Sequence, residues 1–260
     1  MLPTVLSPGT QARQYAAAGA GGGGGFSPLS LSPLVWFDAS VANSLFQDTG
    51  GTTPATADAD PVGLWKDQSG NANNATSATS TNKPTLKLAI KNGKNVVRFD
   101  GVNDRVKTVA LSLGQTWTSF AAAIGPASAM AQQILIATES NSLSFHGFLY
   151  FANATTMRAQ GYNTLQTYFL TDKTIPANTW ALQSSLVNSA VTCYVNGSGS
   201  TPATITGTPM SGSFTLSIGY FGEIYFLAGD IAEVLFFNSG LSDTDRQSVE
   251  SYLNAKWAIY

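Results

Sequence analysis

The chain has 260 residues, of which 43% are hydrophobic and only 11% are charged, with a formal net charge of −2. The apolar share can build a core, but the charged share lies far below the usual quarter, so the surface must be polar and largely uncharged. This charge balance excludes a basic surface for nucleic acid. No apolar run is long enough for insertion into a membrane. Cys193 is the single cysteine, which excludes an intrachain disulfide.

Residues 1–33 carry no usable periodicity and are predicted to form an extended attachment arm. They contain four prolines (Pro3, Pro8, Pro28 and Pro33) and the unbroken tract Gly21–Gly25. A glycine tract of this kind is a flexible coil in solution, so we expect another subunit or a neighbouring protein to hold the arm. The alternative is that the arm folds back on its own domain. The first residues lack the basic and apolar regions of a signal peptide.

From residue 34 onward, short runs rich in β-branched and aromatic residues alternate with polar turns, which predicts an antiparallel β-sandwich. Asn92-Gly93, between two such runs, is the strongest short signal for a hairpin. The predicted strands cover residues 34–37, 62–66, 86–90, 96–99, 120–124, 134–138, 144–151, 156–160, 166–170, 180–187, 191–195 and 215–220.

The last 32 residues predict a buried strand, a turn and one short helix. Residues 231–237 are mostly apolar and are followed by Asn238-Ser239-Gly240, a typical turn. Ser242 with Asp245 forms a capping-box pattern, which predicts the start of a helix. Beyond it, apolar residues recur at spacings of three and four and predict one inward-facing side.

Four stretches together resemble the laminin G-like, or concanavalin A-like, jelly-roll domains. They are LVWFDAS at 34–40, LWKDQSGN at 64–71 with VVRFDGVNDRV at 96–106, CYVNG at 193–197, and the closing segment from Gly229. The resemblance implies one all-β domain over residues 34–260, an antiparallel jelly-roll sandwich with a single short C-terminal helix. The same fold carries lectins, glucanases, adhesins and structural modules, so it does not decide function.

The sequence predicts no catalytic constellation. Glucanases on this fold use acidic residues two positions apart on one strand. The four glutamates (Glu139, Glu223, Glu233 and Glu250) have no acidic partner at that spacing, and Asp243 with Asp245 is explained by helix capping. The only histidine, His146, and Cys193 are both interpreted as packed strand residues.

The resemblance also implies two kinds of binding site. Relatives often bind calcium through loop oxygens, which makes Asp67, Asp100 and Asp104 candidate ligands, although turn capping explains each of them and is the interpretation we favour. Glycan binding would need exposed rings, and the candidates are Tyr150, Tyr162, Tyr168, Tyr220, Phe221 and Tyr225, although aromatic residues in a sandwich more often pack in the core.

Because laminin G-like domains are frequent in phage structural proteins, the resemblance, together with the sparse charge and the arm, favours a non-enzymatic bacteriophage virion surface protein, either a head decoration or fibre or a tail-associated subunit. The arm would attach it to other virion proteins, we expect a homo-oligomer, and the jelly roll would display a surface for host glycans. No cofactor is required, and calcium is the one candidate ion. The alternatives are a carbohydrate-binding adhesin module of a bacterial surface protein and, less favoured, a glycan-active enzyme.

Overall fold

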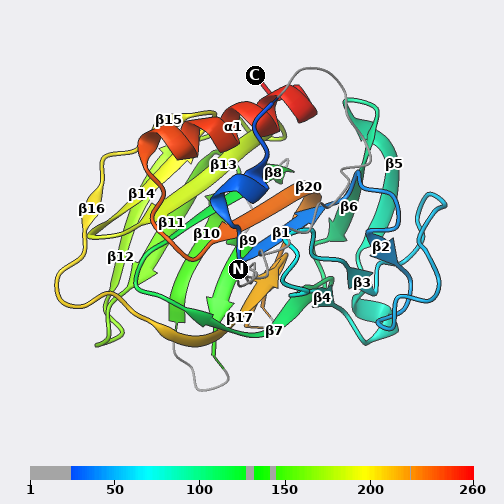
Figure 1. Ribbon diagram of the computed structural model, residues 1–260, viewed down its shortest axis with the longest axis horizontal. Helices are drawn as coiled ribbons and strands as arrows, with labels where there is room; N and C mark the ends of the chain where they lie inside the picture. The colour runs from blue at the N-terminus through cyan, green and yellow to red at the C-terminus, as the bar shows by residue number, and fades with distance from the viewer. Residues whose placement is uncertain (1–24, 127–131, 141–144, 223) are drawn as a thin grey trace, which may run out of the picture.

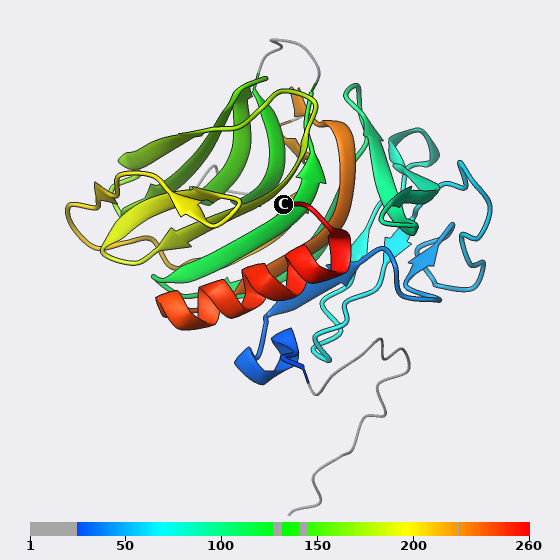
Figure 2. The same ribbon diagram turned by 90° about the horizontal axis from the view of Figure 1, so that it is seen from above.

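The computed structural model describes residues 25–126, 132–140, 145–222 and 224–260, and these form two antiparallel sheets packed face to face (Figures 1 and 2). The predicted all-β sandwich with a C-terminal helix is therefore confirmed. Residues 1–24, most of the predicted arm, lie outside the described residues, and so does Glu223.

The first sheet, here sheet A, is centred on β20, whose two halves pair with different strands. The first half of β20 pairs with β6 and the second half with β1, while β8 runs along its other side. In order across the sheet, its strands are β15 (Ser198–Gly199), β14 (Ala190–Val195), β13 (Trp180–Val187), β8 (Trp117–Ile124), β20 (Ala228–Phe237), β6 (Lys94–Asp100) and β5 (Thr85–Lys91), with β1 (Val35–Asp38) on β20 and β16 (Ala203–Thr204) on β14.

The second sheet, sheet B, contains four long strands, β9 to β12, that lie side by side in chain order (Figure 1). Its order is β12 (Tyr168–Thr174), β11 (Thr156–Tyr162), β10 (Phe145–Asn153), β9 (Gln133–Glu139), β17 (Gly212–Ile218), β7 (Val106–Leu113), β4 (Ala75–Thr76), β3 (Leu64–Trp65) and β2 (Leu45–Phe46). A separate small hairpin joins β18 (Tyr220–Phe221) to β19 (Tyr225–Phe226), and two short 3-10 turns are η1 (Pro28–Leu31) and η2 (Ser80–Asn82).

The main core fills the space between the sheets with alternate residues of each strand. Trp117 of β8 stacks on Phe236 of β20 with ring centroids 5.5 Å apart, and Leu149 and Phe151 of β10 belong to the same core cluster from sheet B. Because successive side chains on a strand point to opposite faces, the residues between these lie on the outer faces of the sandwich.

The single helix of the described chain, α1 (Asp243–Trp257), covers the outer face of sheet A (Figure 2). Ser242 caps it as predicted, since its Oγ accepts from the backbone N–H of Asp245 at 3.1 Å. Val249, Leu253 and Trp257 pack against apolar side chains of β8, β13 and β20. Nowhere in the described chain is there a helix with the length and apolar character to cross a membrane.

The hairpin predicted at Asn92-Gly93 is present between β5 and β6. Both residues have positive φ, 49° and 67°, which is the conformation of the two-residue turn that suits twisted strands.

Leu31 of η1, within the predicted arm, packs against the apolar cluster under α1.

Several strands differ from the prediction. The two-residue strands β2, β4, β15, β16 and β19 were not predicted. β7 was not predicted, because its sequence VKTVALSL does not alternate strictly between polar and apolar residues, and Val109 and Ala110 are both exposed in its middle. β12 begins at Tyr168 rather than at residue 166, because Gln166 takes a positive φ of 59° and its N–H bonds the carbonyl of Asn163 in the preceding turn.

Candidate functional site

The most distinctive surface of the molecule is an aromatic cluster on the outer face of sheet B. On β10, Leu149 and Phe151 face the main core, so Phe148 and Tyr150 face outward. On β11, Met157 and Ala159 face the core, which places Arg158, Gln160 and Tyr162 on the same outer face. We call the group of Phe148, Tyr150, Tyr162, Tyr168, Phe221 and Tyr225 the aromatic face.

The register of the strands brings these side chains side by side. Tyr150 lies opposite Arg158, and Tyr162 lies opposite Tyr168 on β12, with the two tyrosine rings 6.4 Å apart. The ring of Phe148 meets that of Tyr162 edge-on at 5.9 Å. Residues directly opposite on neighbouring strands are in contact range, so register alone forms this part of the cluster.

The hairpin of β18 and β19 adds two rings from a distant part of the sequence. Phe221 packs edge-on against Phe148, with centroids 4.8 Å apart, and its ring lies parallel to that of Tyr225 at 6.4 Å. Edge-to-face and offset pairs of this kind contribute about 0.5–1.5 kcal/mol each beyond the area that they bury. The hairpin is therefore fixed to sheet B by ring contacts.

The aromatic face has a buried base and a more exposed rim. Phe148 and Tyr150 are only 5% and 4% exposed, whereas Tyr162, Phe221 and Tyr225 are half-buried and Tyr168 is 58% exposed. A row of partly exposed rings on a buried support is a platform on which a flat apolar surface can rest.

Polar groups are held between the rings by a chain of hydrogen bonds. The hydroxyl of Tyr150 donates to Gln160 Oε1 at 3.1 Å, and Gln160 Nε2 donates to the hydroxyl oxygen of Tyr162 at 2.6 Å. Burial raises the pKa of Tyr150, and it raises the pKa of Tyr162 to about 12. Both phenols are therefore neutral and able to donate and accept hydrogen bonds at physiological pH.

An ion pair borders the face on the β11 and β12 side. Arg158 Nε and Nη2 donate to the two carboxylate oxygens of Asp172 at 2.5 and 2.7 Å, a two-point contact between directly opposite residues. The guanidinium also lies over the ring of Tyr150, 5.9 Å from its centroid. The hydrogen bonds to Asp172 raise the pKa of Arg158, so this side chain remains charged.

Of the tyrosines singled out from sequence, the structure gathers four on this face and places the fifth elsewhere. Tyr150, Tyr162, Tyr168 and Tyr225 belong to the aromatic face. Tyr220 is 3% exposed, because its ring stacks on Phe226 and lies under the guanidinium of Arg105. Neither Phe148 nor the Arg158–Asp172 pair was a sequence candidate. The visible signal was alternation, with Phe148 and Tyr150 on one strand and Arg158, Gln160 and Tyr162 on the next.

The carboxylate of Asp67, one of the calcium candidates, caps a turn. It accepts from the backbone N–H groups of Trp36, Ser69 and Asn73 at 2.9 Å each and from the hydroxyl of Ser69 at 2.7 Å. These contacts join the first strand to the turn at residues 67–73, which is a structural role.

The other two calcium candidates cap one shared turn. Asp100 Oδ1 accepts from the backbone N–H groups of residues 102, 103 and 104, while Asp104 Oδ2 accepts from the N–H of Asp100 at 2.9 Å. Burial, with a smaller effect of the Asp100 charge, raises the pKa of Asp104 to about 7. Within the described residues, no three His, Cys, Asp or Glu side chains come together as a group that could hold a metal ion.

His146 and Cys193 are packed residues, as their sequence context predicts. His146 lies between Trp117 and Phe214, and its Nε2 is 2.7 Å from the carbonyl oxygen of Gly114. Burial lowers the pKa of His146 to about 4 and raises the pKa of Cys193 to about 12. Neither group has the character of a catalytic base or nucleophile at neutral pH.

A buried charged network under α1 was not predicted from sequence. Glu233 of β20 accepts from the indole N–H groups of Trp36 and Trp257 at 2.6 Å each. Lys256 of α1 pairs with Glu233 at 2.7 Å and also with Asp38. Burial raises the pKa of Glu233, and the Asp38 charge adds to this effect, while Lys256 opposes it. Each polar atom has a partner inside the network, which indicates a structural role in holding the helix.

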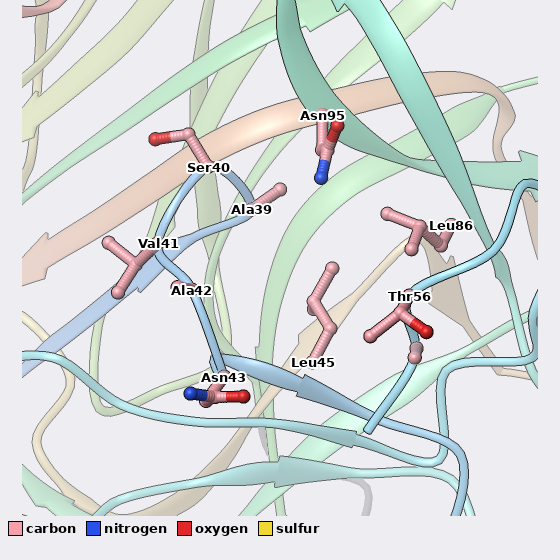
Figure 3. Close-up of a pocket in the computed structure, with 10 residues that line it drawn as sticks. Ala39, Ser40, Val41, Ala42, Asn43, Leu45, Thr56, Leu86 and Asn95 are labelled. Carbon is pink, nitrogen blue, oxygen red and sulfur yellow. The ribbon is translucent and has the colours of Figure 1, made fainter.

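Figure 3 shows a hollow of about 290 Å³ between the loop after β1 and the β5–β6 hairpin. Leu45, Leu86 and Asn95 point into it, and small side chains from residues 39–43 close one side. No ring or charged group lines it, and Asn95 Oδ1 already accepts from the N–H of Ala89. It offers less to a ligand than the aromatic face does.

Residues 99–245 match the family model of the concanavalin A-like lectin/glucanases superfamily. The chain belongs to that superfamily. No curated protein matches the chain.

Solved structures with the same fold include two toxin binding domains and an enzyme. The binding domain of Paraclostridial Mosquitocidal Protein 1 is 14% identical with a TM-score of 0.59, over 77% of this chain and 52% of that one. The ligand binding domain of botulinum neurotoxin serotype D, solved in complex with N-acetylneuraminic acid, is 14% identical with a TM-score of 0.59, over 87% and 53%. Trypanosoma rangeli sialidase is 11% identical with a TM-score of 0.56, over 86% and 33%.

The chain spans about half the length of these toxin domains and a third of the sialidase. At such identities the likeness shows a shared lectin-like jelly-roll fold.

Proposed function

We propose that this protein is a non-enzymatic, lectin-like surface module that binds glycans on the aromatic face of sheet B. The observation that carries the proposal is the grouping of four partly exposed rings, Tyr162, Tyr168, Phe221 and Tyr225, on one face. One side of a pyranose ring presents C–H groups that pack on an aromatic ring, and its hydroxyls need hydrogen-bonding partners beside that ring.

The polar groups of the face suit this role. The amide of Gln160 and the hydroxyls of Tyr150 and Tyr162 form one connected, neutral chain beside the rings. A preformed face of this kind binds without ordering flexible loops, which keeps the entropic cost of binding low. The botulinum neurotoxin serotype D domain that shares the fold was solved in complex with N-acetylneuraminic acid, and this agrees with sugar recognition.

The surroundings of the described glutamates support a binding role over glycosidase catalysis. Glu233 is held by two indoles and Lys256 under α1, and Glu250 is held by Arg246 at 2.6 Å. Both lie on the sheet A side. Glu139 accepts from the hydroxyl of Ser217 at 2.9 Å at the end of β9. Glu233 shares Lys256 with Asp38, and Glu250 shares Arg246 with Asp243, so the carboxylates nearest to these two glutamates are engaged in structural ion pairs.

A direct experiment for glycan binding is a printed glycan array probed with the labelled wild-type chain and with Tyr168→Ala and Tyr225→Ala. We expect the wild-type chain to bind a subset of glycans and both variants to lose most of that signal. Tyr260→Ala is the matched control, because Tyr260 is 56% exposed but follows α1 on the sheet A side. Equal binding by all four proteins would contradict the proposal.

For its biological setting, we propose display on a bacteriophage virion, as a homo-oligomeric head decoration, fibre or tail-associated subunit attached through residues 1–33. The sparse charge and the glycine tract in this arm support that setting. An adhesin module of a bacterial surface protein is the second candidate, favoured by the same aromatic face.

Mass spectrometry of purified particles separates these two settings. Stoichiometric presence in virions is expected, and deletion of residues 1–24 should abolish incorporation while sparing Leu31, which packs under α1. Unchanged incorporation of the deletion variant would contradict attachment through the arm.

A further inference from the structure

The charge of the aromatic face is balanced by one ion pair. Within β10, β11 and β12, the strands that carry most of the rings, the charged side chains on the outer face are Arg158 and Asp172. Nε and Nη2 of Arg158 donate to Asp172 at 2.5 and 2.7 Å, so this edge of the guanidinium is already filled by a carboxylate.

The other ionisable groups of β9 to β12 add no positive charge to the face. Outside these strands, Arg105 lies over the ring of Tyr220 in the β18–β19 hairpin, 5.4 Å from its centroid. Lys173 of β12 points to the opposite side, where its Nζ donates to Ser198 and Gly199 at 2.9 and 3.0 Å. Glu139, at the end of β9, is acidic, and the phenols of Tyr150 and Tyr162 are neutral because burial raises the pKa of each. On the described parts of β9 to β12, an anionic sugar would therefore meet no cation that lacks a partner.

We propose that the aromatic face selects neutral glycans over anionic ones, and that Asp172 determines this specificity by occupying Arg158. This inference rests on the proposed glycan-binding function. A guanidinium binds a sugar carboxylate or sulfate through the same two-point geometry that it uses for Asp172. An anionic ligand must displace Asp172 or lie beside it, and both alternatives are unfavourable. A neutral glycan can contact the rings and the hydrogen-bonded groups of Tyr150, Gln160 and Tyr162 without disturbing the Arg158–Asp172 ion pair.

The test uses an array in which each neutral oligosaccharide is printed beside its sialylated counterpart. The full-length wild-type chain should give the stronger signal on the neutral member of each bound pair. A stronger signal on the sialylated member would overturn the selectivity while leaving glycan binding intact. Binding to neither member of any pair would instead overturn the proposed function and this inference with it.

Asp172→Asn tests the role of the ion pair. The change keeps the size of the side chain, and Asp172 is 40% exposed, so the variant should fold. Releasing Arg158 should raise the ratio of sialylated to neutral signal by about tenfold, the scale of one charge-assisted hydrogen bond. An unchanged ratio would overturn the role of Asp172.

Asp58→Asn is the matched control. It removes an acidic partner from an exposed ion pair with Lys87 on β5, in the other sheet, at 2.9 Å. Its ratio of sialylated to neutral signal should equal that of the wild-type chain. A shift equal to that of Asp172→Asn would show that net charge alone acts, and would also overturn the inference.

Discussion

Lys256, near the end of α1, forms an ion pair with Glu233 in the middle of β20, with Nζ 2.7 Å from Oε2 and the carboxylate fully buried. The same ammonium also pairs with Asp38 of β1. One side chain of the helix thus neutralises two buried acids that come from the two neighbouring strands on which the helix rests.

Lys256→Met should strongly destabilise the fold. It leaves Glu233 and Asp38 buried without their cation, and removal of one partner from a buried pair typically costs about 3–5 kcal/mol. Urea unfolding should show a lower midpoint with an unchanged slope. The matched control is Lys87→Met, which breaks an exposed pair and should cost less than about 1 kcal/mol. Equal losses in the two variants would contradict a structural role for the network.

Asp104 should make stability depend on pH between about 4 and 7. Its pKa is about 7 in the folded chain, against 3.8 ordinarily, mainly because the carboxyl is buried. The folded state therefore holds this proton more tightly than the unfolded state. Its contribution is fully present below pH about 4 and is lost as the pH rises through about 7, by about 2–4 kcal/mol.

Asp104→Asn should remove that part of the pH dependence. The amide oxygen can still accept from the N–H of Asp100, so the turn is kept. Unfolding free energies of both proteins, measured from pH 4 to pH 8, should diverge as the pH rises, with the variant the more stable at pH 8. Parallel curves would show that Asp104 does not titrate in this range.

Asp67 should act as a capping residue and not as a calcium ligand. Asp67→Ala removes the acceptor of three backbone N–H groups and should lower the unfolding free energy by about 2 kcal/mol or more. A chelator should leave the melting temperature of the wild-type chain unchanged. A rise in melting temperature with added calcium, absent from Asp67→Ala, would instead identify a calcium site at this turn.

Much of the fold could be predicted from sequence because its signals are local. Asn92-Gly93 specifies its own turn, Ser242 and Asp245 cap α1, and the apolar run 231–237 lies within β20. β7 was missed because one of its faces is exposed, so its residues show no clear apolar run.

The aromatic face could be predicted only in part. Single tyrosines such as Tyr162 and Tyr168 were visible as candidates, but their contact depends on the register of β11 and β12. Phe221 reaches Phe148 across more than 70 residues of sequence, which no local pattern encodes. For the buried network under α1, the sequence held one signal. Glu233 lies inside a buried apolar strand, and a carboxylate in that position requires partners.

The most direct measurement for glycan binding on the aromatic face is ¹⁹F NMR of the fluorotyrosine-labelled chain during titration with the best array glycan. Single Tyr→Phe variants would assign the signals. We predict that the signals of Tyr162, Tyr168 and Tyr225 shift in proportion to occupancy, while those of the buried Tyr220 and of Tyr260 on the sheet A side stay in place. Shifts confined to Tyr260, or binding that leaves every tyrosine signal of the aromatic face unmoved, would contradict the assignment.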